Sequence, residues 1–195
     1  GQPPQTIVGD HGTLTVTGFT YDPITGNGTI TYSYTLTSPT QGDTTTDDFP
    51  VVITEQDGDT AKATLTVSIV DDVPVARNDL DTLPAGSFGP ETGNVITGIG
   101  TVGAPGPDTK GADNATLTAI ASTNVPGNLP TVNPDGSITV AGQYGVLTIK
   151  PNGDYSYTRN PGTPGDVVDV FRYTLTDGDG DASAANLTIN IGDLP

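Results

Sequence analysis

The sequence predicts an all-β chain of two tandem sandwich units, and three observations carry this prediction. The 195 residues include 17 Pro and 26 Gly, which break helices and favour turns. Apolar residues recur at every second position in short runs, the period of a strand with one buried face, and no long run has helical spacing. Residues 49–71 align without a gap on residues 171–193, so the chain contains an internal repeat.

The repeat predicts four strands that both units share. Two of them flank an acidic turn, and each of these two carries three apolar residues at period two. Two further strands precede them, because residues 12–16 resemble 145–149 and residues 30–34 resemble the strand around 155–157. The apolar positions of the flanking strands are Phe49, Val51 and Ile53, which match Phe171, Tyr173 and Leu175, and Leu65, Val67 and Ile69, which match Leu187, Ile189 and Ile191.

The boundary between the units is expected at residues 71–74, DDVP, which gives a first unit of residues 1–72 and a second of residues 73–195. Proline cannot donate to a strand ladder and restricts the residue before it, so it marks the exit from a last strand. A sandwich of this kind needs about seven strands and about 100 residues. The first unit has no counterpart of the strands expected within residues 73–143. It is either a reduced domain or the second half of a domain that begins upstream or is split by an inserted module, and the sequence leaves these alternatives open.

The charge of the chain is strongly negative, at −17, and all but two of its 23 acidic residues are Asp, the exceptions being Glu55 and Glu91. Solubility alone would be served equally well by Glu. Short Asp side chains instead suit turns and sites for hard cations, where carboxylate and backbone oxygens converge. Such a polyanion repels phosphate backbones, so we expect no nucleic-acid partner.

Several residue types that other functions need are missing. Cysteine, methionine and tryptophan are absent and His11 is the single histidine, so neither disulfides nor a typical zinc or copper site is expected. Without a Cys nucleophile or a Gly-x-Ser-x-Gly elbow, we expect no enzyme. No apolar run reaches the ~18 residues of a membrane span and no signal peptide opens the sequence. We therefore expect no membrane insertion, and an internal piece of a longer chain.

Two aligned acidic clusters are the candidate metal ligands. The second unit has Asp177, Asp179 and Asp181 spaced by glycines, and the first has their counterparts Glu55, Asp57 and Asp59. Three carboxylates within five residues repel one another unless a cation offsets them, and Ca²⁺ prefers oxygen ligands of this kind. The alternative is that each Asp-Gly run is simply a polar hairpin turn.

One triad supplies too few oxygens for calcium, so further ligands are expected at strand ends and in the linker. A joint site between the units would combine the first cluster with Asp71, Asp72 and either Asn78 or Asp79, and Asp193 would serve the same role after the second unit. The remaining Asp residues read as solvated loop residues, although Asp108 and Asp113 offer a further ion site in their long loop.

The second unit resembles a known family in the runs GQYGVLTIKPNGDYSYT and DVFRYTLTDGDGDASAANLTINI. These are similar to the VCBS and cadherin-like repeats, which are bacterial immunoglobulin-like domains of giant repeats-in-toxin (RTX) adhesins exported by type I secretion. The resemblance implies a secreted, cell-surface extender whose neighbouring domains are stiffened by Ca²⁺ at their joints. It further implies a monomer that projects distal modules onto surface glycans or proteins in cell adhesion and biofilm formation. The first unit departs from the pattern by replacing DGDGD with EQDGD.

Two other functions compete with an extender. One is a carbohydrate- or protein-binding module, but such sites cluster aromatic residues, and only Tyr21, Phe88 and Tyr144 are expected to be free for contact. The other is a non-catalytic accessory domain of a secreted hydrolase. That alternative predicts the same fold and the same use of calcium, so only flanking sequence distinguishes it.

Overall fold

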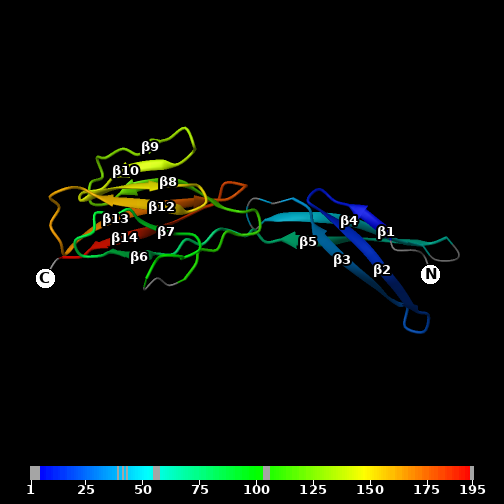
Figure 1. Ribbon diagram of the computed structural model, residues 1–195. Coiled ribbons are helices and arrows are strands. Elements are labelled where there is room, and N and C mark those ends of the chain that lie inside the picture. The colour runs from blue at the N-terminus through cyan, green and yellow to red at the C-terminus, as the bar shows by residue number, and fades with distance from the viewer. Residues whose placement is uncertain are drawn as a thin grey trace. The chain divides into compact units, whose positions relative to one another are not determined.

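The computed structural model describes residues 5–38, 40, 42, 44–54, 58–102 and 106–193. Its regular elements are all β-strands, which confirms the predicted all-β class (Figure 1). The chain divides into two compact units, Gly1–Asp71 and Asp72–Pro195. Within the described ranges there is no helix with the length and apolar character needed to cross a membrane.

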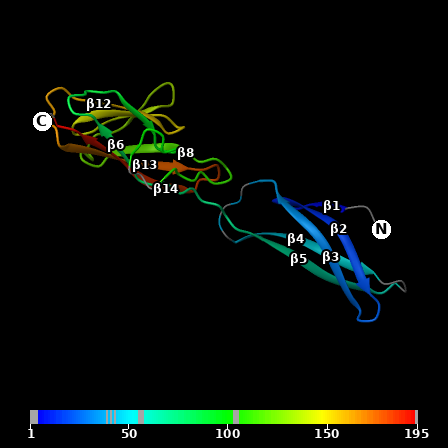
Figure 2. The ribbon, with the colours of Figure 1, turned by 60° about the horizontal axis from the view of Figure 1, so that its bottom comes forward.

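Unit 1 contains two small antiparallel sheets, drawn in blue to blue-green (Figures 1 and 2). The first has the order β1-β2-β3 and the second is the hairpin β4-β5. The strands are β1 (Gln5–Val8), β2 (Gly12–Asp22), β3 (Asn27–Leu36), β4 (Thr45–Thr54) and β5 (Thr60–Ile69).

Unit 2 is a two-sheet sandwich. One sheet has the order β7-β12-β11-β10-β9, and the other has the order β6-β14-β13-β8, in which β6 runs parallel to β14. The strands are β6 (Asp79–Leu83), β7 (Glu91–Asn94), β8 (Thr116–Ser122), β9 (Thr131–Val132), β10 (Ile138–Ala141), β11 (Gly145–Ile149), β12 (Asp154–Arg159), β13 (Val167–Thr176) and β14 (Ala182–Ile191).

The period-two pattern explains the core of unit 2. On β14 the side chains of Leu187, Ile189 and Ile191 are fully buried, while those between them are more exposed. The inward residues of both sheets meet in one apolar cluster, within which Tyr157 and Phe171 pack edge to face with ring centroids 6.1 Å apart. Alternation along each strand therefore builds the sandwich that the sequence predicts.

The internal repeat holds at the level of strand register. Leu14 pairs with Tyr34 in unit 1 as Leu147 pairs with Tyr157 in unit 2. Likewise, Phe49 pairs with Leu65 as Phe171 pairs with Leu187. Strands β1 to β5 are thus the counterparts of β10 to β14, in the same order and with the same pairings.

Both units fasten their two sheets with a buried aspartate. In unit 2 the Asp169 carboxylate, fully buried, accepts hydrogen bonds from the amides of Gln143 (2.8 Å) and Tyr144 (3.0 Å) and from the Tyr157 hydroxyl (2.7 Å). In unit 1 Asp47 does the same for the β1–β2 turn and for Tyr34, whose hydroxyl donates at 2.7 Å. The sequence reasoning missed this pair of aspartates, although the ungapped alignment extends back by two residues to match them.

Candidate metal site and other candidate positions

The turn between β13 and β14 is shaped by its first aspartate. One carboxylate oxygen of Asp177, Oδ1, accepts from the amides of Gly180 (3.1 Å) and Asp181 (2.7 Å), which closes the turn. Gly180 has φ of +110°, a backbone conformation that favours glycine. Turn chemistry alone therefore explains part of the DGDGD run.

A second loop brings another carboxylate to this turn. Asp113, which lies between β7 and β8, accepts a hydrogen bond from the Asp179 amide through Oδ2 at 3.2 Å. Gly178 leaves the room for it, because a Cβ there would lie 3.1 Å from the same oxygen. Carboxylate oxygens of Asp113, Asp177 and Asp179 all lie within 4.8 Å of one another, and the three residues are half-buried.

The remaining oxygen of Asp177, Oδ2, is buried and has no hydrogen-bond partner among the described residues. A buried carboxylate oxygen without a partner is costly, and neighbouring carboxylates add repulsion. A hard divalent cation offsets both, and its preferred ligands are carboxylate and carbonyl oxygens with water. The residues present therefore fit a calcium ion, with Asp113, Asp177 and Asp179 as its carboxylate ligands.

The candidate ligands of unit 1 that the structure describes, Asp59 and Asp71, lie at opposite ends of β5. Glu55 and Asp57 lie outside the described residues, and Asp59 is exposed at the start of β5. Asp71 follows the other end of β5, where its Oδ2 accepts from the Gly42 amide at 2.7 Å. A ten-residue strand spans roughly 33 Å, so Asp59 and Asp71 cannot bind the same ion.

The same geometry corrects the expectation for the end of unit 2. Asp193 follows β14, whereas Asp177, Asp179 and Asp181 precede it. The ten residues of β14 again separate the two groups by roughly 33 Å. Asp193 therefore adds no oxygen to the acidic turn of its own unit.

The linker residues have separate roles within unit 2. Asp72 accepts from the Ala112 amide at 2.8 Å, which ties the start of the unit to the loop that carries Asp113. The side-chain oxygen of Asn78 accepts a hydrogen bond of 2.9 Å from the backbone amide of Asn186 on β14. Asp79 pairs with Leu187, six residues along β14 from Asp181 and therefore roughly 20 Å from it. Neither Asn78 nor Asp79 joins the acidic turn.

Asp79, which is buried, instead shares a tyrosine hydroxyl with the half-buried Asp108. The Tyr173 hydroxyl lies 2.9 Å from Asp108 Oδ2, 3.1 Å from Asp79 Oδ2 and 2.7 Å from the Arg77 carbonyl oxygen. One hydroxyl proton serves only one of these acceptors at a time. Burial raises the pKa of Asp79 to about 6 and also raises the pKa of Asp108.

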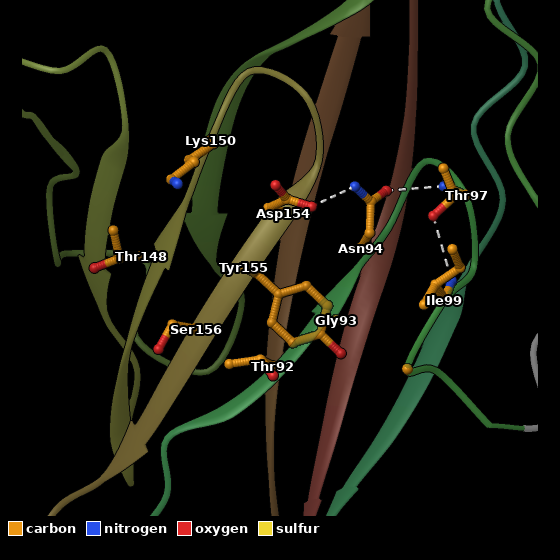
Figure 3. A pocket seen from close by; sticks show the side chains of 11 residues that line it. Thr92, Gly93, Asn94, Thr97, Ile99, Thr148, Lys150, Asp154, Tyr155 and Ser156 are labelled. Atoms are coloured by element: carbon orange, nitrogen blue, oxygen red, sulfur yellow. Dashed lines mark hydrogen bonds between the residues drawn. The ribbon is translucent and has the colours of Figure 1, made fainter.

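A hollow with a volume of about 600 Å³ lies over β7, β11 and β12 (Figure 3). Asp154 and Asn94 point toward each other there, and the Asn94 amide donates to the carboxylate at 2.8 Å. Hydrogen bonds from Asn94 and Asn152 lower the pKa of Asp154. Its one aromatic, Tyr155, is only 4% exposed and donates its hydroxyl proton to Asp81, so it offers little surface for stacking a sugar.

The fold and these sites define an immunoglobulin-like β-sandwich, a class that typically serves as a structural or binding module and not as an enzyme. Residues 71–190, more than half of the chain, match the bacterial Ig domain family, and the chain belongs to that family. Domains of this family are common in extracellular and surface proteins. No curated protein matches the chain.

Proposed function

We propose that the chain is a calcium-stiffened extender segment of a large bacterial surface adhesin. Three findings support the proposal: membership of the bacterial Ig domain family, two successive units with the same strand register, and the acidic cluster at one end of unit 2. The VCBS or cadherin-like repeats of RTX adhesins, with export by type I secretion, are the narrower family that we propose. In this role the chain carries distal modules that bind surface glycans or proteins.

The proposed calcium site rests on one observation: Oδ2 of Asp177 is buried without a hydrogen-bond partner among the described residues, beside two further carboxylates. An ion bound there would join the β13–β14 turn to the Asp113 loop. That loop is already hydrogen-bonded to Asp72, the first residue of unit 2. Calcium would therefore also restrain the segment through which the chain enters the unit, and this is how we propose that it limits bending in a tandem array.

The test is a calcium titration of the chelator-stripped 195-residue chain, followed by calorimetry and thermal unfolding. Binding to the folded state alone stabilises it by about 2.7 kcal/mol when the ion is at a hundredfold excess over Kd. Asp177→Asn and Asp113→Asn should each weaken this stabilisation. Asp166→Asn is the matched control, because it removes the same charge at an exposed position away from the cluster.

Two results would contradict the proposal at different levels. A melting temperature that is the same in millimolar calcium and in chelator would rule out a calcium site. If calcium binds but small-angle scattering curves are identical with and without it, the stiffening role fails while the site stands.

The second candidate function is a carbohydrate- or protein-binding module, favoured by the hollow over β7, β11 and β12. Its polar lining includes Lys150 and Ser156. A glycan array probed with the 195-residue chain tests it. A saturable sugar whose binding is lost in Lys150→Ala would support this function over a purely mechanical one.

A further inference from the structure

Unit 1 repeats only part of the sandwich that unit 2 completes. Strands β1 to β5 correspond to β10 to β14, but among the described strands unit 1 has no counterpart of β6, β7 or β8. In unit 2 these three strands pair with β14, β12 and β13 respectively. The equivalent edges of β5, β3 and β4 therefore lack the neighbours that the repeat provides.

Several side chains of unit 1 are more exposed than their counterparts in unit 2. Ile53 is 44% exposed, whereas its counterpart Leu175 is fully buried. Tyr32 is 45% exposed, whereas its counterpart Tyr155 is 4% exposed. These are inward-facing positions by register, so their exposure reflects missing neighbours and not a solvent-facing side of the sheet.

Tyr32 lines an apolar groove of about 400 Å³ in unit 1, and so do Val51 and Val52, the neighbours of Ile53 on β4. Residues of both sheets line it, and they include Leu14, Val16, Tyr32, Phe49, Val51 and Leu65. In unit 2 the matching space is filled by apolar side chains of the extra strands, such as Leu83 on β6 and Leu117 and Ile120 on β8, all at most 2% exposed. The groove is thus lined by apolar residues whose counterparts in unit 2 are buried.

We infer that this groove is filled by a segment of the same polypeptide ahead of β1, which supplies strands equivalent to β6, β7 and β8. Strand order favours this occupant, because in unit 2 all three filling strands precede β10, the counterpart of β1. The segment adds one strand parallel to β5 and one antiparallel strand each to β4 and β3. By analogy with β6 and β8, its inward residues should combine apolar side chains, such as Leu83, Leu117 and Ile120, with buried acceptors such as Asp81. This inference is independent of calcium.

The main experiment grafts a second copy of residues 73–137 directly ahead of Gln5. This junction follows the register, since Gln5 pairs with Val16 as Ile138 pairs with Ile149. Hydrogen–deuterium exchange of β3, β4 and β5 should slow by roughly 100-fold in the graft, because their amides gain strand partners. The melting temperature of unit 1 should rise by at least about 5 °C. A control graft carries Asp at the copied positions of Leu117 and Ile120, and should give neither effect.

A pair of substitutions keeps the inference testable even if the graft does not fold. In the 195-residue chain, Ile53→Asp should leave the melting of unit 1 within about 2 °C of its starting value, because the position is open, whereas the matched Leu175→Asp should unfold unit 2. In the folded graft, Ile53→Asp should abolish the added protection.

Three outcomes would overturn the inference. They are a folded graft that leaves exchange in unit 1 unchanged, an Ile53→Asp variant that unfolds unit 1 without any graft, and a stable dimer of the 195-residue chain in which β4 and β5 are protected. The last of these would assign the groove to a second copy.

Discussion

The two units share five strands and one register, yet they differ greatly in what they bury. Unit 2 buries 19 apolar side chains in one cluster, whereas Leu14, Phe49 and Ile69 are the buried apolar side chains among the described residues of unit 1. The same alternating pattern therefore gives a packed core only where neighbouring strands cover it. The alternation of apolar residues determines where the strands form. The number of strands determines how much apolar surface each unit buries, and hence its free energy of unfolding.

The largest effect that tests this comparison is expected at the buried aspartate that both units share. Asp169→Ala leaves two backbone amides and the Tyr157 hydroxyl without their acceptor in a fully buried position. We expect a loss of about 3–5 kcal/mol in the free energy of unfolding of unit 2. Calorimetry measures the loss, and Asp47→Ala should act on the unit 1 transition instead. If Asp169→Ala shifts both transitions equally, the units are not independent.

The next largest effect compares truncations on β14, which has a strand on each side, and on β5, which pairs with β4 alone among the described strands. Leu187→Ala removes a fully buried side chain from β14 and should cost about 2–5 kcal/mol. The matched Leu65→Ala, at a half-buried position of β5, should cost less, about 1 kcal/mol. Denaturant unfolding of both variants gives the two values. Equal costs would mean that unit 1 is packed as tightly as unit 2.

The smallest effect is a dependence on pH that only unit 2 should show. The pKa of Asp79 is about 6 in the folded chain and lower when unfolded, so the folded state binds its proton first as pH falls. Stability of unit 2 should therefore rise between pH 7 and about pH 4, by on the order of 1–2 kcal/mol in chelator. The pKa of Asp108 is also raised, so its protonation likewise increases the stability of unit 2 as pH falls.

Thermal unfolding across this pH range measures the effect, and Asp79→Asn is the control that should flatten the profile. Unit 1 has no counterpart of β6 and hence no equivalent group among its described residues. A unit 2 transition that falls steadily from pH 7 to pH 5 would contradict the assignment.

The sequence predicted the sandwich class, the repeat and four of the five strands that the units share, because each depends on apolar residues at period two. It did not predict which aspartates are structural. Asp47, Asp81 and Asp169 are buried acceptors for tyrosine hydroxyls, so part of the Asp excess serves the core and not a cation. A carboxylate that points inward from a strand has no local signature that separates it from one in solvent.

The candidate metal ligands illustrate both limits of sequence reasoning. Asp113 reaches the turn at Asp177 only through the tertiary fold, so the sequence placed it with a separate ion in its own loop. By contrast, the separation of Asp59 from Asp71 follows from strand length, and counting ten residues of extended chain would have found it. Calcium at the predicted positions, including those of unit 1, stays a prediction.

The parallel pairing of β6 with β14 has a mechanical consequence. These are the first and last strands of unit 2, and five residue pairs join them, from Asp79 with Leu187 to Leu83 with Ile191. A pull on the two ends of the unit acts on the start of one strand and the end of the other, in opposite directions along the same ladder. The load then falls on all the connecting hydrogen bonds together, in shear, so they must break at once and not one after another.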